Sequence, residues 1–116
     1  MRHGVKGRKL GLTRGKRKAF LKTLAGNLIK KERILTTEAR AKEVRPLVER
    51  FISYGKRRNL QGLRLLLQKL PKEAAFKVYY EISPRYESRR GGYVRIVKRV
   101  SVRRGDGAKM ATIEFV

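Results

Sequence analysis

Apolar side chains recur at helical spacing early in this chain. A helix predicted from about Thr13 to Lys30 would carry, on one side, Phe20, Leu21, Leu24 and Leu28. Several Lys and Arg residues lie between these apolar positions. We therefore expect a first helix that places its apolar side in a core and turns a cationic side outward.

A second helix has the clearest pattern. Its apolar residues follow the i, i+3, i+4, i+7, i+8 spacing of one helix face, and they are Val44, Leu47, Val48, Phe51 and Ile52. Thr36 or Thr37 can cap its start, with Glu38 favourably placed in the first turn. Gly55 is the expected stop.

Pro46 lies inside this second helix. A proline in a helix interior removes one backbone hydrogen bond at a cost of ~3 kcal/mol. We therefore expect either a kink near Lys42 or two abutting helices. The short segment Arg33 to Thr36, just before the helix, reads as extended and can add a third strand to a small sheet.

Two further helical patterns follow. The first contains Leu60, Leu63, Leu66, Leu67 and Leu70 and should be ended by Pro71. The second contains Ala75, Val78, Tyr79 and Ile82. It should end before Pro84, because the residue that precedes a proline avoids helical backbone.

The pattern then changes from helical to alternating. One side of an extended segment would carry Val94, Ile96, Val100 and Val102, interrupted only by Lys98. The opposite side would carry Tyr93, Arg95, Arg99 and Arg103. We expect a strand with one apolar face and one largely cationic face.

A tight turn and a last strand complete the chain. Gly105, Asp106 and Gly107 favour a turn, and after it Ala111, Ile113 and Phe115 alternate with more polar residues. The prediction is an α+β fold: about four α-helices packed with a small β-sheet of two or three strands, a C-terminal β-hairpin and a basic, flexible N-terminal arm.

Charge divides the chain into two parts. The first thirty-one residues contain eleven Lys or Arg and no Asp or Glu, and the whole chain has a net charge of +23. A polyanionic partner would relieve the resulting self-repulsion. No stretch approaches the ~18 apolar residues that span a bilayer, and no secretory signal is present. We expect a cytoplasmic protein with no membrane partner.

Residues 1–12 should form an arm ahead of a single globular domain at residues 13–116. The arm offers few apolar side chains, whereas ordering its backbone costs ~1–2 kcal/mol per residue. It should therefore be disordered until phosphates bind its Lys and Arg side chains.

Enzymatic chemistry has few candidate residues here. His3 is the only histidine, there is no cysteine, and the nine carboxylates are scattered. Gly91 and Gly92 lack the remainder of a phosphate-binding loop. We expect no catalysis, no cofactor, no metal site and no small-molecule substrate.

Cationic and aromatic residues mark two candidate nucleic-acid contacts. Three arginines on one strand face repel one another, so a phosphate backbone is a suitable counter-charge. In the loop before that strand, arginines at 85, 89 and 90 flank Tyr86 and Tyr93, a combination that can stack on bases and contact phosphates. Tyr86 can equally be a core residue.

Several motifs together resemble one known family. The opening MRH followed by GRKL, the central ERILTTEARAKEVRPLVE, and the closing PRYESRRGGYVRI with RRGDGAKMATIEFV are similar to the bacterial-type large-subunit ribosomal protein seventeen family. The resemblance covers nearly the whole chain. It implies a non-catalytic structural protein that binds large-subunit ribosomal RNA near the outside of the peptide exit tunnel and contacts neighbouring ribosomal proteins.

The resemblance and the charge pattern together give a set of candidate RNA-binding residues. It comprises Arg2, His3, Lys6, Arg8, Lys9, Arg14, Lys16, Arg17, Lys18, Arg40, Lys42, Arg85, Arg89, Arg90, Tyr93, Arg95, Arg99 and Arg103. Two departures limit the transfer. The stretch LTRGKRKAF stands where the family commonly has a polar segment with a histidine, which favours purely electrostatic contacts there. Val94 replaces a usual threonine, which favours burial.

Two other function classes share some of these features. A DNA-compacting architectural protein would have the same charge and the same sensitivity to salt. A nuclease or RNA-modifying enzyme would need an acid and base cluster that the sequence lacks.

Overall fold

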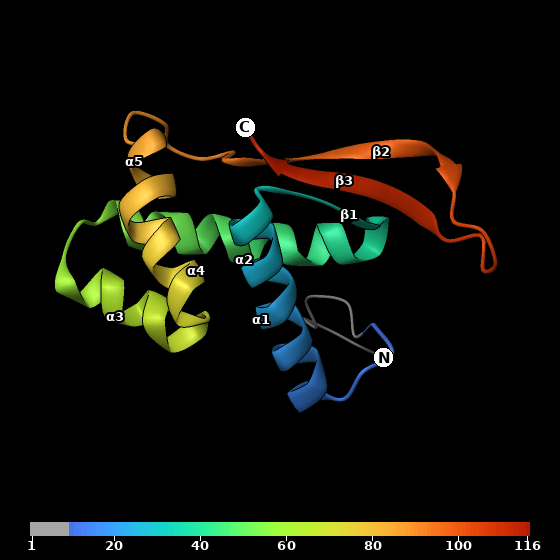
Figure 1. Ribbon diagram of the computed structural model, residues 1–116, viewed down its shortest axis with the longest axis horizontal. Coiled ribbons are helices and arrows are strands. Elements are labelled where there is room, and N and C mark those ends of the chain that lie inside the picture. The colour runs from blue at the N-terminus through green and yellow to red at the C-terminus, as the bar shows by residue number, and fades with distance from the viewer. Residues whose placement is uncertain (1–9) are drawn as a thin grey trace, which may run out of the picture.

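The computed structural model describes residues 10–116, which form a layer of helices beneath a three-stranded sheet (Figure 1). The elements are α1 (Arg14–Lys31), β1 (Arg33–Thr37), α2 (Glu38–Lys56), α3 (Leu60–Lys69), α4 (Lys72–Lys77), the π-helical turn η1 (Val78–Ile82), α5 (Ser83–Arg85), β2 (Val94–Val102) and β3 (Lys109–Phe115). The predicted α+β class is confirmed. The predictions for residues 1–9 lie outside the described residues.

The sheet is antiparallel, with β3 in the centre and the order β1-β3-β2. The segment at 33–36 therefore does form the third strand. Ile34 lies opposite Ile113, which in turn lies opposite Ile96. This row of isoleucines faces the helices, because Ile113 is fully buried and the other two pack against the core cluster.

The core lies between α2 and the sheet, with α1, α3 and η1 around it. Four of the five predicted α2 residues are at most 1% exposed, namely Val44, Val48, Phe51 and Ile52, and the fifth, Leu47, is half-buried against them. Leu28 and Leu66 bring α1 and α3 into the same cluster. Val94 is also buried, as expected for a valine at that position.

Helix α2 is one continuous helix, so the alternative of two abutting helices is wrong. Its cap is Thr37, whose hydroxyl accepts a hydrogen bond from the Arg40 backbone N–H at 3.3 Å. The helix passes through Pro46 and also through Gly55, the expected stop. Gly55 serves a different purpose, because a Cβ there would lie 2.1 Å from Oγ of Ser83 on α5.

The helical run from Lys72 continues through Pro84 to Arg85, so the prediction that it ends before Pro84 is wrong. The π-helical turn η1 accounts for this. Bonds in a π-helix join residues five apart, which would pair the N–H of residue 84 with the carbonyl of Tyr79. Proline has no N–H, and the Arg58 guanidinium donates to that Tyr79 carbonyl instead.

The outer half of β2 is not covered, which corrects the expectation of an apolar face along the whole strand. Val100 is fully exposed and Val102 is 57% exposed, whereas Val94 is 1% exposed. In Figure 1 the β2–β3 hairpin extends beyond the end of α2, so no helix lies beneath its tip. The pairing register also shifts between Lys98 and Val102, as in a β-bulge.

Candidate nucleic-acid interface

Helix α1 provides a surface of unpaired positive charge. It contains no carboxylate, and the exposed side chains of Arg14, Lys16, Lys18 and Lys22 point away from the core together with the half-buried Arg17. None of these five forms an ion pair within residues 10–116. Phosphates could therefore bind here without displacing an internal partner.

Arg40 adds a positioned guanidinium beside this surface. It lies on α2, 4.8 Å from the ring centroid of Phe20 on α1. Phe20 is half-buried and not part of the core cluster, so its expected core role is wrong. A guanidinium held over a ring keeps its N–H donors directed toward solvent and ligands. Arg40 is therefore suited to phosphate contact.

Lys42, the other α2 candidate, is held by a carboxylate. Its Nζ lies 2.8 Å from Glu38, whose other neighbour is Lys98 on β2 at 3.6 Å. The hydrogen bond from Lys42 is the main cause that lowers the pKa of Glu38. Lys42 is thus held in an ion pair with Glu38 of the same helix, and it is less available to a phosphate than Arg40.

A groove of about 300 Å³ extends the α1 surface toward α3. Lys18 and Lys22 form one wall, Lys69 and Gln68 the other, and Leu47 and Phe51 of α2 line its base. No carboxylate lines it. The three ammonium groups can pair with the phosphate of a nucleotide, and the apolar floor of the groove can contact the flat face of its nucleobase.

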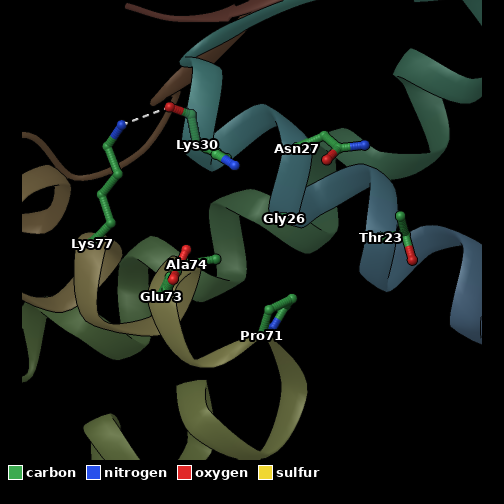
Figure 2. A pocket seen from close by; sticks show the side chains of 8 residues that line it. All are labelled: Thr23, Gly26, Asn27, Lys30, Pro71, Glu73, Ala74 and Lys77. Atoms are coloured by element: carbon green, nitrogen blue, oxygen red, sulfur yellow. Dashed lines mark hydrogen bonds between the residues drawn. The ribbon is translucent and has the colours of Figure 1, made fainter.

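A second groove, between α1 and α4, has a different character (Figure 2). It has a volume of about 380 Å³, and its lining includes Glu73 as well as Lys30 and Lys77. Lys77 is tied down, because its Nζ donates to the Lys30 carbonyl at 2.9 Å and lies 3.3 Å from Glu32. With a carboxylate in the wall and one lysine engaged, this groove suits a polyanion less well.

The loop before β2 is organised by Lys56 of α2. Lys56 Nζ donates to the Tyr93 hydroxyl at 2.9 Å and to the Arg89 carbonyl, and the Tyr93 hydroxyl donates to the same carbonyl at 3.2 Å. Tyr93 is only 2% exposed. Its ring is therefore unavailable for stacking on a base, contrary to the sequence interpretation, and it supports the loop instead.

Tyr86 is likewise a core residue. It is 5% exposed, its ring centroid lies 5.3 Å from that of Tyr93, and its hydroxyl donates to the Val116 carbonyl at 2.7 Å. Burial raises the pKa of the Tyr86 hydroxyl. The aromatic pair therefore anchors the C-terminus of the chain beneath the loop.

The arginines of this loop differ in how free they are. Arg85 pairs with Glu32, which lies at the end of α1, and this contact is the main cause that lowers the pKa of the Glu32 carboxyl. Arg89 donates to the Gly91 carbonyl at 3.1 Å within its own loop. Arg90 is exposed and forms no ion pair among residues 10–116. It is the free cation of the three.

The cations of β2, and Arg103 directly after it, have internal partners, which corrects the expectation that acids are too few to pair with them. Arg95 lies 3.0 Å from Glu114, Lys98 lies 3.6 Å from Glu38, and Arg103 pairs with Asp106 in the turn. Arg99 donates to the Thr112 hydroxyl at 3.1 Å. The strand is therefore a weaker phosphate surface than α1.

The Arg103–Asp106 pair makes a testable prediction about pH. The Arg103 hydrogen bond, assisted by the Ala108 backbone N–H, lowers the pKa of Asp106 from 3.8 to about 2. A lowered folded-state pKa gives a stabilising contribution that is present above the unfolded pKa and diminishes as pH falls through the folded one. NMR titration of the Asp106 carboxyl should show a midpoint near 2. In Arg103→Gln the midpoint should rise toward 3.8, and an unchanged midpoint would contradict the pairing.

The structure separates the sequence-predicted residues into three regions. In Figure 1 the start of α1, the loop between α5 and β2, and the hairpin turn lie at different sides of the molecule. The candidates Arg2, His3, Lys6, Arg8 and Lys9 lie outside the described residues. Lys22 and Lys69, which border the groove, were not among the candidates. Lys22 belongs to the cationic side expected from the spacing of the first helix, whereas Lys69 joins it only through tertiary packing.

Two kinds of site are absent from the described part of the chain. Across residues 10–116, no cluster of three His, Asp or Glu side chains could hold a metal ion. Over the same residues, no helix has the length and apolar character to cross a membrane.

Comparisons with known proteins agree on one family. A family model described as ribosomal protein L17 matches residues 20–116. Proteins named large ribosomal subunit protein bL17 are similar over 100% of this chain. The relative from Fusobacterium nucleatum is 48% identical and covered over 100% of its length, that from Thermodesulfovibrio yellowstonii 46% identical over 87%, and that from Agrobacterium fabrum 44% identical over 82%. The chain therefore belongs to the ribosomal protein L17 family.

Proposed function

We propose that this protein is a structural constituent of the large ribosomal subunit that binds and stabilises folded large-subunit ribosomal RNA. Its relatives are named as large-subunit proteins, which supports the ribosomal assignment. Its role would be to support subunit assembly and translation in the cytoplasm, without catalysis. A position near the exterior of the peptide exit tunnel is part of the proposal and rests on family membership alone.

The observation that carries RNA binding is the acid-free surface of α1. Its cations have no internal partners among residues 10–116, the ring-supported Arg40 lies beside them, and the groove toward α3 adds Lys69. The phosphates of a duplex or of an unpaired nucleotide can bind the cations of this surface. An unstacked nucleobase of folded RNA can in addition contact the apolar floor of the groove. We place the principal RNA contact here and a second contact at Arg90.

Co-sedimentation tests the ribosomal assignment. Lysate of the source bacterium is fractionated at physiological salt, and the protein is followed across the gradient. It should migrate with the large subunit and remain there after a wash that strips loosely bound basic proteins. Migration with chromosomal DNA, or exclusive recovery in the free fraction, would contradict the proposal.

The N-terminal segment is proposed as a third, separate source of phosphate contacts. Deleting residues 1–12 removes four Lys or Arg and no carboxylate. The slope of log affinity for a large-subunit RNA fragment against log salt should therefore fall by up to ~1 for each phosphate that the segment neutralises. Affinity is measured across a salt series, with circular dichroism to verify that 13–116 folds as an independent domain. An unchanged slope would show that the segment makes no phosphate contacts.

A further inference from the structure

We propose that the exposed edge of the β2–β3 hairpin is a docking surface for another protein of the large subunit, which would add an extended segment beside β2. This inference rests on the proposed ribosomal function and adds a protein contact to it. The surface, here called the valine edge, consists of Val100 and Val102 together with the free backbone edge of β2.

The valine edge is unusually apolar for so basic a chain. Val100 is fully exposed and Val102 is 57% exposed, and both lie near the outer end of β2. In Figure 1 this part of the hairpin extends past the helical layer, so the described fold offers nothing to cover it. A run of exposed β-branched residues on a projecting strand is typical of an interaction site rather than of solvated surface.

The cations around these valines are already engaged. Arg95, Lys98 and Arg103 each have a carboxylate partner within the chain, and Arg99 is bonded to Thr112. A phosphate backbone would have to compete with these partners and would leave the valines in water. An apolar protein segment would bury the valines and leave the ion pairs intact. The contacts therefore favour protein over RNA at this place.

The backbone of β2 can accept a further strand. The sheet order places β2 at an edge, with β3 on one side only. The Val94 N–H donates to Glu49 at 3.3 Å, so it points away from β3. By the alternation of an antiparallel ladder, the N–H and C=O groups of Ile96 and Lys98 then point to the same open edge. These groups can bond a partner strand as in β-augmentation.

Charge identifies the kind of segment that fits. A second copy of this chain is unsuitable, because its hairpin would bring the same Lys and Arg residues against Arg99, Arg104 and Lys109 in a chain of net charge +23. The complementary segment is extended, has apolar side chains at alternate positions and carries acidic residues near the turn. We assign that segment to a different large-subunit protein.

The first test replaces valine by lysine at two positions, Val100→Lys with Val102→Lys. Both side chains are exposed, so the fold should be retained, and added positive charge would strengthen a contact with RNA. The variant and wild type are co-expressed in the source bacterium, and their ratio in purified large subunits is compared with their ratio in lysate. We expect the variant to be depleted about tenfold, which corresponds to about 1.4 kcal/mol.

Equal or higher occupancy of the lysine variant would overturn the protein contact. Exposed Leu60 on α3 provides a matched control, since Leu60→Lys adds a charge away from the hairpin and should leave the ratio unchanged. Absence of the wild-type protein from the subunit would instead contradict the proposed function. The two failures are therefore distinguishable.

The second test identifies the partner directly. A photoreactive benzoyl-phenylalanine is placed at position 100 of the full chain, purified large subunits are irradiated, and adducts are mapped by mass spectrometry. We expect an adduct with a defined peptide of another large-subunit protein. An adduct only with ribosomal RNA, only with a second copy, or no adduct would overturn the proposal. The same group at exposed Tyr80 is the control, and it should not give the same peptide.

Discussion

We expect RNA affinity to fall about a hundredfold when Lys16, Lys18 and Lys22 of α1 are replaced by glutamine. Removing any other three positive charges from residues 10–116 should weaken binding less. These side chains are exposed and lie on a helix without carboxylates. Each phosphate contact contributes ~0.9 to the slope of log affinity against log salt. If each of the three lysines contacts one phosphate, their loss corresponds to about a hundredfold weaker binding at ~0.15 M salt. Filter binding or fluorescence anisotropy with a large-subunit RNA fragment measures the change.

A control with the same change in net charge separates surface geometry from total charge. Arg95→Gln, Lys98→Gln and Arg103→Gln also remove three positive charges, but these residues have internal carboxylate partners. Their combined effect on affinity and on the salt slope should be clearly smaller. Equal effects of the two triple variants would mean that net charge alone determines binding, and the assignment to α1 would be wrong.

Phe51→Ala is expected to give the largest loss of stability from a single substitution. Phe51 is 1% exposed and lies in the core cluster at the centre of the helical layer, on α2. Removing a buried phenylalanine side chain costs ~3–5 kcal/mol, partly because the cavity does not close. The free energy of unfolding of an ordinary domain is only ~5–15 kcal/mol, so the variant should be close to unfolding at growth temperature. Urea unfolding followed by circular dichroism measures the difference.

Leu60→Ala is the matched control for that change. Leu60 is 60% exposed at the start of α3, so its truncation should change the free energy of unfolding by no more than ~0.5 kcal/mol. Similar destabilisation at the two positions would contradict the placement of Phe51 in the core.

The fold was largely predictable because its periodic segments coincide with its elements. The i, i+3, i+4 pattern around Val48 predicted α2, and Thr37 is its cap. Alternation after the turn predicted β3, and the extended segment at 33–36 became β1. In each case the side-chain period is set by the backbone geometry of the element, so the pattern is visible without knowledge of tertiary contacts.

The errors arise where tertiary packing determines the outcome. Val100 occupies a position that the alternating pattern of β2 assigns to the buried face. It is exposed because the hairpin extends beyond the helices, which only the packed structure shows. Gly55 resembles a helix stop but provides room for Ser83. Pro84 is accommodated after a π-helical turn, where the Arg58 guanidinium donates to the Tyr79 carbonyl in place of the N–H that proline lacks. None of these contacts is encoded in local spacing.

The candidate interface was predictable only in part for the same reason. Charge composition correctly singled out α1 as acid-free, since that follows from the sequence of one helix. Composition could not show that Tyr93 is buried, that the β2 cations have partners, or that Lys69 joins Lys18 and Lys22 across a groove. Those facts depend on which segments distant in sequence pack together.

The most direct test of ribosomal RNA binding compares RNA with DNA. Affinity of the full chain is measured at physiological salt for a defined large-subunit ribosomal RNA fragment with its folded loops, and for a DNA duplex of equal length. We expect clearly tighter binding to the RNA, because folded RNA offers unstacked nucleotides to the groove as well as phosphates to α1. Equal affinities would contradict ribosomal RNA binding and would favour a DNA-compacting protein.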